Sequence, residues 1–460
     1  MFKKLIATLS AIMVLFSFCF IKSQAEYIAP AEKVEVTITG SGFRSFGFLK
    51  DGNIKTYKTS NGNCAITIES QTDMYSLYIM FDLEYGSYTI TDNTNNLTLN
   101  AGEYSFLHEY VKLSKPTKSV TFNFENGEVR LSEITAYGYG STPNGVQVWL
   151  PPLDNKADIL LFASHGDDDQ LFFAGLFPLY AAEKQCAVQV AYLTDHRNLT
   201  KTRTHEMLNG LWQTGITAYP VFGRFDDFRI DDLQGTYNRY AQLGVTKDEL
   251  QAFVVEQVRR FKPQVAITHD LNGEYGHGMH KMYADLLINS LEITNDETQF
   301  AESAKKYGVW DIPKTYIHLY EQNQIVIDYD TPLDSFDGLT AFEVTKKYGY
   351  PCHESQQYTW FTNWINGSNT AAGIKTHNPC KFGLYRTTVG EDVLKNDFME
   401  NIVKYADQKP PKSEPSTLST NQNNAKKQNQ EQSNIWTWVV AGIGVLSVAA
   451  LVLILINRRR

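Results

Sequence analysis

In the stretch LLFASHGDDDQLFF, from Leu160 to Phe173, an apolar run ends in one histidine and three consecutive aspartates, and apolar residues then resume at once. Three adjacent like charges repel one another, so either a cation lies beside them or the cluster lies fully in water. A lone run of aspartates is usually a solvated loop. The apolar residues on both sides of this run argue against that reading and favour a cation.

Strands and helices alternate along the residues that surround this stretch. Such alternation is typical of an α/β fold with a Rossmann-like, doubly wound, mostly parallel sheet, in which ligands bind at the carboxyl ends of the strands. The predicted strands are residues 159–163, 187–194, 219–222 and 264–268, and the predicted helices are 170–184, 202–213 and 247–261. The polar residues expected to converge on one crevice are 165–169, 195–197, 224–227 and 269–270.

His165 and Asp168 lie on one tight turn, where each can offer a ligand atom to a divalent cation. A catalytic zinc site usually has three protein ligands and one open position, so a third ligand must come from another strand end. The stretch NGEYGHGMHKMYADLLINSL supplies His277 and His280, which share one face of a helix that begins there. One His-x-x-His pair alone is more often a surface or core feature. The two elements together, at strand ends of one sheet, predict a metal site.

Three motifs of this chain, SHGDDD, TRTHEMLNGLWQTGI and NGEYGHGMH, together resemble the PIG-L/LmbE-like N-acetylglucosaminyl deacetylases. The usual motifs of that family are A-H-P-D-D-E, a helix with R-x-x-E, and G-H-P-D-H. The resemblance extends roughly from Ile159 to Leu291. It implies a metal-dependent N-deacetylase that uses Zn²⁺, or another divalent ion such as Fe²⁺ or Co²⁺, and acts on an N-acetylated sugar.

The resemblance also implies roles for individual residues. Metal ligands, a general base, donors that stabilise the oxyanion and assist the leaving amine, and substrate contacts are all expected in the crevice. The implied ligands are His165, Asp168 and His280, the implied base is Asp167, the implied donors are His277 and Tyr275, and the expected substrate contacts are Arg203, Arg224 and Asp270.

This chain departs from the family motifs in three places. Gly166 replaces the proline of the first motif, and Asp169 replaces its glutamate. Met279 replaces the aspartate between the two histidines of the last motif, and Asp270 or Glu274 could take the place of that aspartate.

Hydrolysis of an inert N-acetyl amide needs a strong nucleophile near neutral pH, and zinc lowers the pKa of a bound water to about 7. Zinc hydrolysis with Asp167 as the base is therefore the predicted chemistry. Two alternatives stay open: a surface glycan-binding protein whose catalytic domain is degenerate, and a metal-dependent hydrolase of a non-sugar amide.

Before the predicted deacetylase domain, residues 150–405, residues 30–142 alternate between apolar and polar positions, with turn signals such as KDGN and ENGE between the runs. This pattern favours an antiparallel β-sandwich. Its last strand, VRLSEITAYGYG, resembles the closing strand of discoidin-like, galactose-binding domains. A carbohydrate-binding domain is therefore expected, with a packing or spacer role as the alternative.

The two ends of the chain read as targeting segments. Residues 1–25 are expected to be a signal peptide, with an uncleaved anchor as the alternative. Residues 407–434 are expected to be a disordered stalk, 435–456 a transmembrane helix, and 457–460 a short cytoplasmic end. These readings predict a single-pass protein of the cell membrane with its catalytic domain outside the cell, acting on a cell-surface glycan.

The composition limits the other functions. The chain has 460 residues, of which 43% are hydrophobic, and a net charge of -9. No basic stripe is present, which argues against a nucleic-acid partner. Five cysteines do not make a disulfide framework, and the sequence leaves open whether Cys352 and Cys380 pair.

Overall fold

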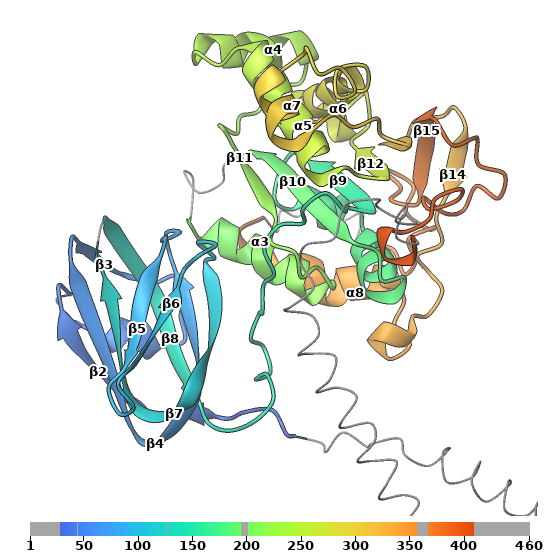
Figure 1. Ribbon diagram of the computed structural model, residues 1–460. Helices are drawn as coiled ribbons and strands as arrows, with labels where there is room; N and C mark the ends of the chain where they lie inside the picture. The colour runs from blue at the N-terminus through green and yellow to red at the C-terminus, as the bar shows by residue number, and fades with distance from the viewer. Residues whose placement is uncertain (1–27, 44, 126, 195–200, 357–366, 409–460) are drawn as a thin grey trace, which may run out of the picture. The chain divides into compact units, whose positions relative to one another are not determined.

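The computed structural model describes residues 28–43, 45–125, 127–194, 201–356 and 367–408. The predicted signal peptide, nearly all of the predicted stalk, the segment 435–456 and the segment 457–460 lie outside these residues. Within them, a β-rich region precedes an α/β region (Figure 1).

The N-terminal region is an antiparallel sheet structure of eight strands. Apolar and polar side chains alternate along its strands, so that Ile66 and Ile68 are fully buried while Thr67 between them is partly exposed. The strands follow the order β1-β8-β4-β7-β5-β6, with β2 beside β4 and β3 beside β8. Their bounds are β1 Lys33–Val34, β2 Val36–Ser41, β3 Lys58–Asn61, β4 Cys64–Phe81, β5 Tyr88–Asp92, β6 Leu97–Ala101, β7 His108–Phe124 and β8 Glu128–Tyr137. Sugar binding by this region stays a prediction.

The α/β region is built on a seven-stranded sheet with the order β11-β10-β9-β12-β13-β15-β14. The first five strands of this order are parallel, and β15 pairs antiparallel with both β13 and β14. The bounds are β9 Ile159–Ala163, β10 Val188–Thr194, β11 Val221–Phe225, β12 Val265–Thr268, β13 Lys314–His318, β14 Gln324–Val326 and β15 Lys381–Thr387.

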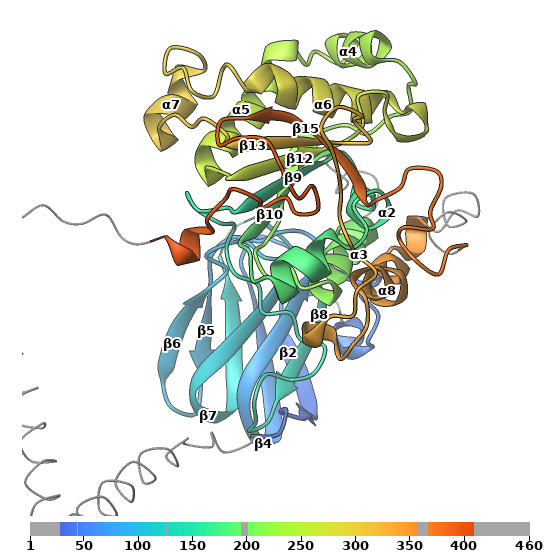
Figure 2. The same cartoon turned by 90° about the vertical axis from the view of Figure 1, so that its right-hand side faces the viewer.

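Helices cover both faces of this sheet, with α4, α5, α6 and α7 on one face and α3 and α8 on the other (Figures 1 and 2). Alternate residues of β9 therefore enter different cores: Leu160 packs in the cluster that contains α5 and α6, and Leu161 in the one that contains α3. The α-helices are α2 Asp168–Leu171, α3 Lys201–Gln213, α4 Leu233–Gln242, α5 Lys247–Phe261, α6 Gly278–Ser290, α7 Ala301–Tyr307 and α8 Ala341–Val344. Short 3-10 or π turns are η1 Gly47–Lys50, η2 Pro178–Glu183, η4 Glu274–Gly276, η5 Asp334–Phe336, η6 Thr345–Gly349, η7 Tyr350–Cys352, η8 Glu354–Gln356 and η9 Tyr405–Asp407.

Local signals explain where these elements begin and end. α5 has the predicted bounds because Thr246 and Glu249 form a reciprocal capping box at its start and Lys262 takes a left-handed conformation at its end. The single helix predicted at residues 170–184 is wrong. Gly175 has φ +98°, which no helix accommodates, so the chain instead forms α2 and, after an irregular turn, η2.

The strand predicted at residues 219–222 is displaced along the chain: β11 spans Val221–Phe225. Arg224 therefore lies within the strand, and the polar residues that follow it are residues 226–229. The cysteines within the described ranges are free thiols, including Cys352 and Cys380.

Within the described residues no helix is long and apolar enough to cross a bilayer. The longest helix there, α5, has 15 residues, whereas a span needs about 20 consecutive apolar residues. This finding corrects the predicted fold that ends in a transmembrane helix and, with it, the predicted membrane-anchored location outside the cell. Residues 435–456 themselves lie outside the described ranges.

A buried ion pair fastens the segment after β15 to the sheet. The Lys314 ammonium, at the start of β13, donates to Asp392 Oδ1 at 2.5 Å and to the carbonyl of Glu400 at 2.8 Å. The hydroxyl of Tyr316 donates to the other oxygen of Asp392 at 2.5 Å. Both ionic side chains are almost fully buried, so the two charges depend on each other.

We expect Lys314→Met to destabilise the fold by about 3–5 kcal/mol, because it leaves the Asp392 carboxylate buried without its cation. The free energy of unfolding from urea titration measures this loss. Lys347→Met is the control, since Lys347 forms an exposed pair with Glu343 at 3.1 Å and should change stability little. Equal effects of the two substitutions would contradict the importance of the buried pair.

Candidate metal centre

The candidate site lies where the strand order of the α/β sheet reverses. β9 pairs with β10 on one side and with β12 on the other, and all three run parallel. At such a switch point the loops that leave the carboxyl ends of adjacent strands diverge and open a crevice. His165 follows β9 and His269 follows β12, so both are delivered to this crevice.

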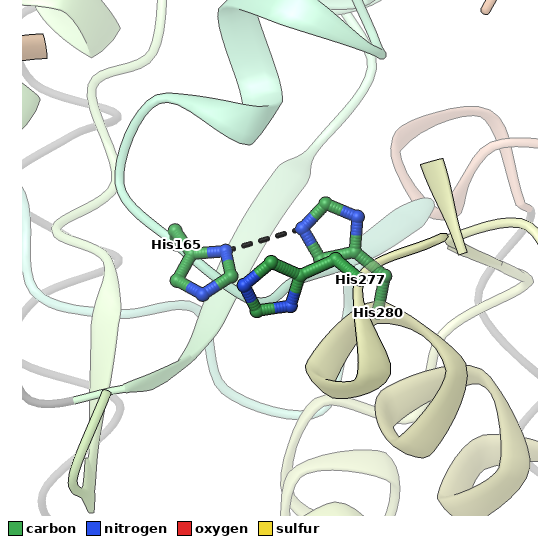
Figure 3. Close-up of side chains that lie close together, drawn as sticks. All are labelled: His165, His277 and His280. Atoms are coloured by element: carbon green, nitrogen blue, oxygen red, sulfur yellow. Dashed lines mark hydrogen bonds between the residues drawn. The ribbon is translucent and has the colours of Figure 1, made fainter. Parts of the chain in front are cut away.

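Ligand atoms of three residues face one another there. His165 Nδ1 lies 3.0 Å from Asp168 Oδ2, His280 Nε2 lies 3.2 Å from His165 Nδ1, and His280 Nε2 lies 3.4 Å from Asp168 Oδ1. Figure 3 shows the rings of His165 and His280 facing each other. Metal–ligand bonds of about 2.1 Å in a tetrahedron place neighbouring ligand atoms about 3.4 Å apart. These three residues therefore fit a zinc-like ion.

Two overlapping groupings among the described residues have three ligand atoms within 4.8 Å of one another: Asp168 with His269 and His280, and His165 with His277 and His280. In each grouping, a backbone N–H donates a hydrogen bond to one ring nitrogen of the histidine that is not in the trio. The Ser164 N–H donates to His269 Nε2 at 2.9 Å, which uses that nitrogen's lone pair. The Met279 N–H donates to His277 Nδ1 at 3.2 Å, which places the ring proton of the neutral imidazole on Nε2. His269 and His277 are therefore poorer ligands than His165, Asp168 and His280.

Each histidine of the trio has a carboxylate behind it. His280 Nδ1 lies 2.7 Å from Glu274 Oε2, and His165 Nε2 lies 3.2 Å from Asp227 Oδ1. A carboxylate in this position fixes the tautomer and ring orientation of a metal-binding histidine. Burial alone would raise the pKa of Asp168, but His280, His165 and His269 around it hold that pKa well below its ordinary value.

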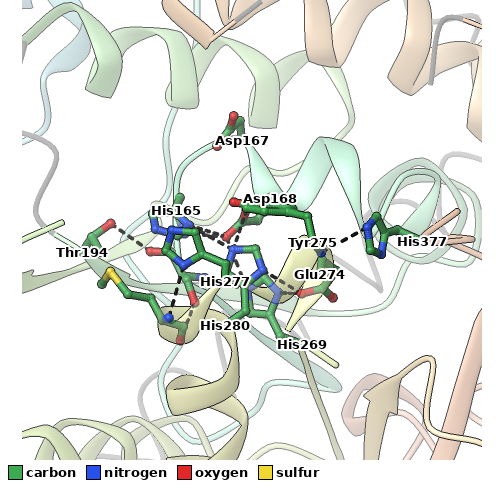
Figure 4. A network of polar contacts seen from close by, with 12 residues as sticks. His165, Asp167, Asp168, Thr194, His269, Glu274, Tyr275, His277, His280 and His377 are labelled. Atoms are coloured by element: carbon green, nitrogen blue, oxygen red, sulfur yellow. Dashed lines mark hydrogen bonds and ion pairs between the residues drawn. The ribbon is translucent and has the colours of Figure 1, made fainter. Parts of the chain in front are cut away.

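Asp167 is adjacent to Asp168 but faces a different partner. Its Oδ1 accepts a hydrogen bond from Arg203 Nη2 at 3.0 Å, and in Figure 4 its side chain points away from the histidine rings. Burial raises the pKa of Asp167, an effect that Arg203 opposes and Asp168 reinforces. Asp167 is thus a carboxylate outside the trio with an increased affinity for a proton.

Asp169, the third aspartate of the run, has yet another state. Burial raises its pKa to about 8, so at neutral pH this carboxyl is mostly protonated. Its Oδ2 accepts a hydrogen bond from Gln170 Nε2 at 2.6 Å. The three consecutive residues therefore do not carry three equal charges.

His277 is a neutral hydrogen-bond donor. It occupies the N-cap of α6 through its bond to the Met279 amide. Burial, together with His165 and His280, lowers the pKa of His277 to about 2. A neutral ring with Nδ1 engaged can donate from Nε2, but it carries no extra proton to give to a leaving amine.

Tyr275 is held in a strained backbone conformation. Its φ is +47° and its ψ is +24°, the left-handed region that non-glycine residues rarely adopt. The Tyr275 N–H donates to His377 Nε2 at 3.1 Å, and in Figure 4 its ring extends over the site toward Asp168. Burial and the charge of Asp168 raise the pKa of Tyr275 far above its ordinary value, so the hydroxyl keeps its proton. Strain of this kind concentrates at functional sites.

A cavity of about 310 Å³ opens beside the trio. Of the predicted site residues, Arg224 and Asp270 are not among those that line it: Arg224 is exposed and lies 3.5 Å from Glu249, and Asp270 accepts a hydrogen bond from the Asn272 amide. The residues that line the cavity are His165, Asp167, Asp168, Arg203, Asp227, Phe228, Arg229, Tyr275, His277 and Gln356. His280 lies beneath it, and residues 195–197 lie outside the described ranges.

Sequence reasoning expected Asp227 in the crevice without giving it a role, and it did not assign Phe228, Arg229 or Gln356 to the site. The displacement of β11 explains Phe228 and Arg229, because it moves residues 226–229 to the end of that strand. A larger hollow of about 640 Å³ beside α7 is lined by residues such as Glu256 and Lys306. Its lining includes no histidine or aspartate, so it offers no comparable chemistry.

Comparison with known proteins agrees with this geometry. The family model of PIG-L, GlcNAc-PI de-N-acetylase, matches residues 160–291. The 1D-myo-inositol 2-acetamido-2-deoxy-alpha-D-glucopyranoside deacetylase 1 of Catenulispora acidiphila is 26% identical over 189 residues, which cover 36% of this chain and 58% of that protein. The corresponding deacetylase of Streptomyces avermitilis is 25% identical over 178 residues, or 34% of this chain and 60% of that protein.

Among solved structures, the N,N'-diacetylchitobiose deacetylase from Pyrococcus horikoshii covers 50% of this chain and 84% of its own, with 12% identity and a TM-score of 0.35. The chain spans 58% and 60% of the length of the two curated relatives named above. The matched segment includes His165, Asp168 and His280. Residues 160–291 are therefore similar to the PIG-L family, within a longer chain.

Proposed function

We propose that this chain is a metal-dependent N-deacetylase that hydrolyses the acetamido group of an N-acetylglucosamine-type sugar. The observation that carries the proposal is the separation of roles at one cavity. Ligand atoms of three residues, His165, Asp168 and His280, lie 3.0–3.4 Å from one another, with both oxygens of Asp168 involved. A neighbouring carboxylate, Asp167, stays outside that trio. The PIG-L match and the names of the relatives support the same reaction.

His165, Asp168 and His280 would hold the ion. Two imidazole nitrogens and one carboxylate oxygen suit zinc, and iron(II) or cobalt(II) accept the same donor types. A bound divalent ion supplies Lewis-acid polarisation and lowers the pKa of water.

Asp167 is the proposed base. It removes a proton from the attacking water as the water oxygen forms a bond to the acetyl carbonyl carbon. Its raised pKa suits this task, because a base accepts a proton best when its pKa approaches the working pH. Arg203 holds the carboxylate in place through its bond to Oδ1.

His277 and Tyr275 are the proposed donors to the oxyanion that forms on the carbonyl oxygen. Both are neutral donors that line the cavity, and loss of one such donor typically costs about 3 kcal/mol of transition-state stabilisation. The carbon–nitrogen bond then breaks, and Asp167 returns its proton to the leaving nitrogen. Acetic acid and a free amine form first, and the acid's proton then passes to the amine to give acetate and an ammonium group. The proton count therefore balances without a protonated His277.

The cavity supports a small substrate group. Its volume of about 310 Å³ lies at the lower end of ligand pockets, which range from about 300 to 1,000 Å³. One sugar unit with its acetamido group is a suitable occupant. Arg203 and Arg229 on the cavity wall are the proposed contacts for its polar groups.

We expect the wild-type protein to bind about one divalent ion per chain, because the trio provides three ligands and one open position. His280→Ala should abolish stoichiometric binding, as measured by elemental analysis after reconstitution with zinc. His377→Ala is the matched control, since His377 Nε2 faces the Tyr275 amide instead of the trio. Folded wild-type protein that holds no divalent ion under these conditions would refute the proposed function.

Asp167→Asn should retain zinc and lose acetate release by about 10²- to 10⁴-fold, because asparagine has the same shape but cannot take a proton. Asp168→Asn should instead lower the zinc content. Acetate release from N-acetylglucosamine-type sugars and zinc analysis of the same samples separate the two effects. Equal zinc loss in both variants, or near-normal turnover of Asp167→Asn, would show that the two roles are assigned wrongly.

The pH profile tests the link between Arg203 and Asp167. Arg203 lowers the pKa of Asp167, so Arg203→Met should raise that pKa. Since the base acts when deprotonated, the acid limb of kcat/KM should move to higher pH, whatever happens to the maximum rate. An unchanged limb, or one displaced to lower pH, would contradict Asp167 as the base.

A further inference from the structure

Glu274 is a buried carboxylate that contacts three histidines. Its Oε2 lies 2.7 Å from His280 Nδ1 and 2.9 Å from His269 Nδ1, and its Oε1 lies 2.6 Å from His318 Nδ1. The backbone N–H of Asp270 also donates to Oε1, at 3.2 Å. Glu274 and the three histidines are all fully buried, so these contacts replace water completely.

The contact with His280 determines which nitrogen of that ring can bind a metal. An ionised carboxylate only accepts hydrogen bonds, so the proton of neutral His280 must lie on Nδ1. The lone pair of Nε2 then points toward His165 Nδ1 and Asp168 Oδ1. Without this carboxylate the ring could adopt the opposite tautomer, which offers a proton instead of a lone pair to the ion.

His269, which follows β12, is also held by Glu274. It donates to Glu274 through Nδ1 and accepts the Ser164 amide through Nε2, directly before His165. Its ring also stacks on His280, with centroids 4.1 Å apart and planes inclined by 17°. Glu274 therefore orients His280 directly and supports its packing through His269.

His318, the last residue of β13, holds the other oxygen of Glu274. Its Nδ1 faces Glu274 Oε1, and its Nε2 lies 3.0 Å from the carbonyl oxygen of Asn378. Both partners are acceptors, so His318 serves as a donor at both nitrogens. This arrangement fixes the carboxylate between a rigid strand and the loop that precedes β15.

We propose that Glu274 is a positioning residue for the metal centre and that His318 is its anchor. This inference rests on the proposed function. The family motif carries an aspartate between its two histidines, whereas this chain has Met279, whose side chain is buried in the core with α5 and α6. The carboxylate that supports the histidine ligand comes instead from η4, three residues before His277. Asp270 does not fill that role: its contact with Glu274 is through its backbone.

Glu274→Gln tests the proposal with little change of shape. The amide has one accepting oxygen and one donating NH₂ group, so it cannot accept from His280, His269 and His318 at once. The zinc affinity should fall by about 10- to 100-fold, the usual effect of removing a carboxylate behind a metal-binding histidine. The measurement is competition for zinc between the folded protein and a chelating dye, without any substrate.

Asp392→Asn is the matched control, because Asp392 is also a buried carboxylate that binds β13, through Lys314 and Tyr316. It should lower thermal stability and leave the zinc affinity of the folded protein unchanged. His318→Asn is the second variant, for use also if Glu274→Gln does not fold. It should lose about 10-fold in zinc affinity, the lower end of the same range.

Wild-type zinc affinity in folded Glu274→Gln would overturn the proposal, as would wild-type affinity in His318→Asn if only that variant folds. A loss of affinity in Asp392→Asn equal to that in Glu274→Gln would also overturn it, because the effect would then be one of stability alone. Failure of the wild-type protein to bind zinc is a different result, and it would refute the proposed function itself.

Discussion

The constraint that organises the α/β region is the burial of negative charge at the carboxyl ends of its central strands. Asp167, Asp168, Asp169 and Glu274 are all buried within the loops that leave β9 and β12. A carboxylate without compensation in such a place is strongly unfavourable. The four carboxyl groups are compensated in three different ways, and the site's chemistry follows from those differences.

Asp168 and Glu274 stay ionised because histidines surround them, and their pKa values lie well below the ordinary range. Asp167 has one arginine partner, Arg203, which only partly opposes the rise in pKa that burial causes. Asp169 accepts a hydrogen bond from the neutral side chain of Gln170, and burial leaves it mostly protonated. One run of three identical residues thus holds three carboxyl groups with different pKa values, which the proposed function uses as a ligand, a base and a neutral acid.

The sequence predicted the local part of this arrangement well. The β9 strand and the α5 helix have the expected bounds, because a continuous apolar run and a capping box are signals that neighbouring residues carry. The meeting of His165, Asp168 and His280 also followed from strand ends and motif spacing. The helix expected at residues 170–184 failed at Gly175, where Tyr329 packs so closely that a side chain would collide with its ring.

What could not be predicted depends on contacts between distant parts of the chain. Arg224 was expected in the crevice because strand β11 was placed too early. The shift exposes that side chain, keeps Asp227 at the cavity and adds Arg229 to its lining. His318 lies 44 residues from Glu274 in the sequence and belongs to no motif. Only the pairing of β13 with β12 brings the two together.

Near the end of the described chain, Tyr405 is hydrogen-bonded at the amino ends of the same strands. The Tyr405 amide donates to Asp158, just before β9, and its hydroxyl donates to the carbonyl of Lys262, shortly before β12. The five residues of β9 separate this point from His165 by about 16 Å. A solid support coupled near Tyr405 would therefore lie at the amino ends of these strands and leave the cavity at their carboxyl ends open to solution. This placement suits immobilisation of the proposed deacetylase on a support in a flow reactor.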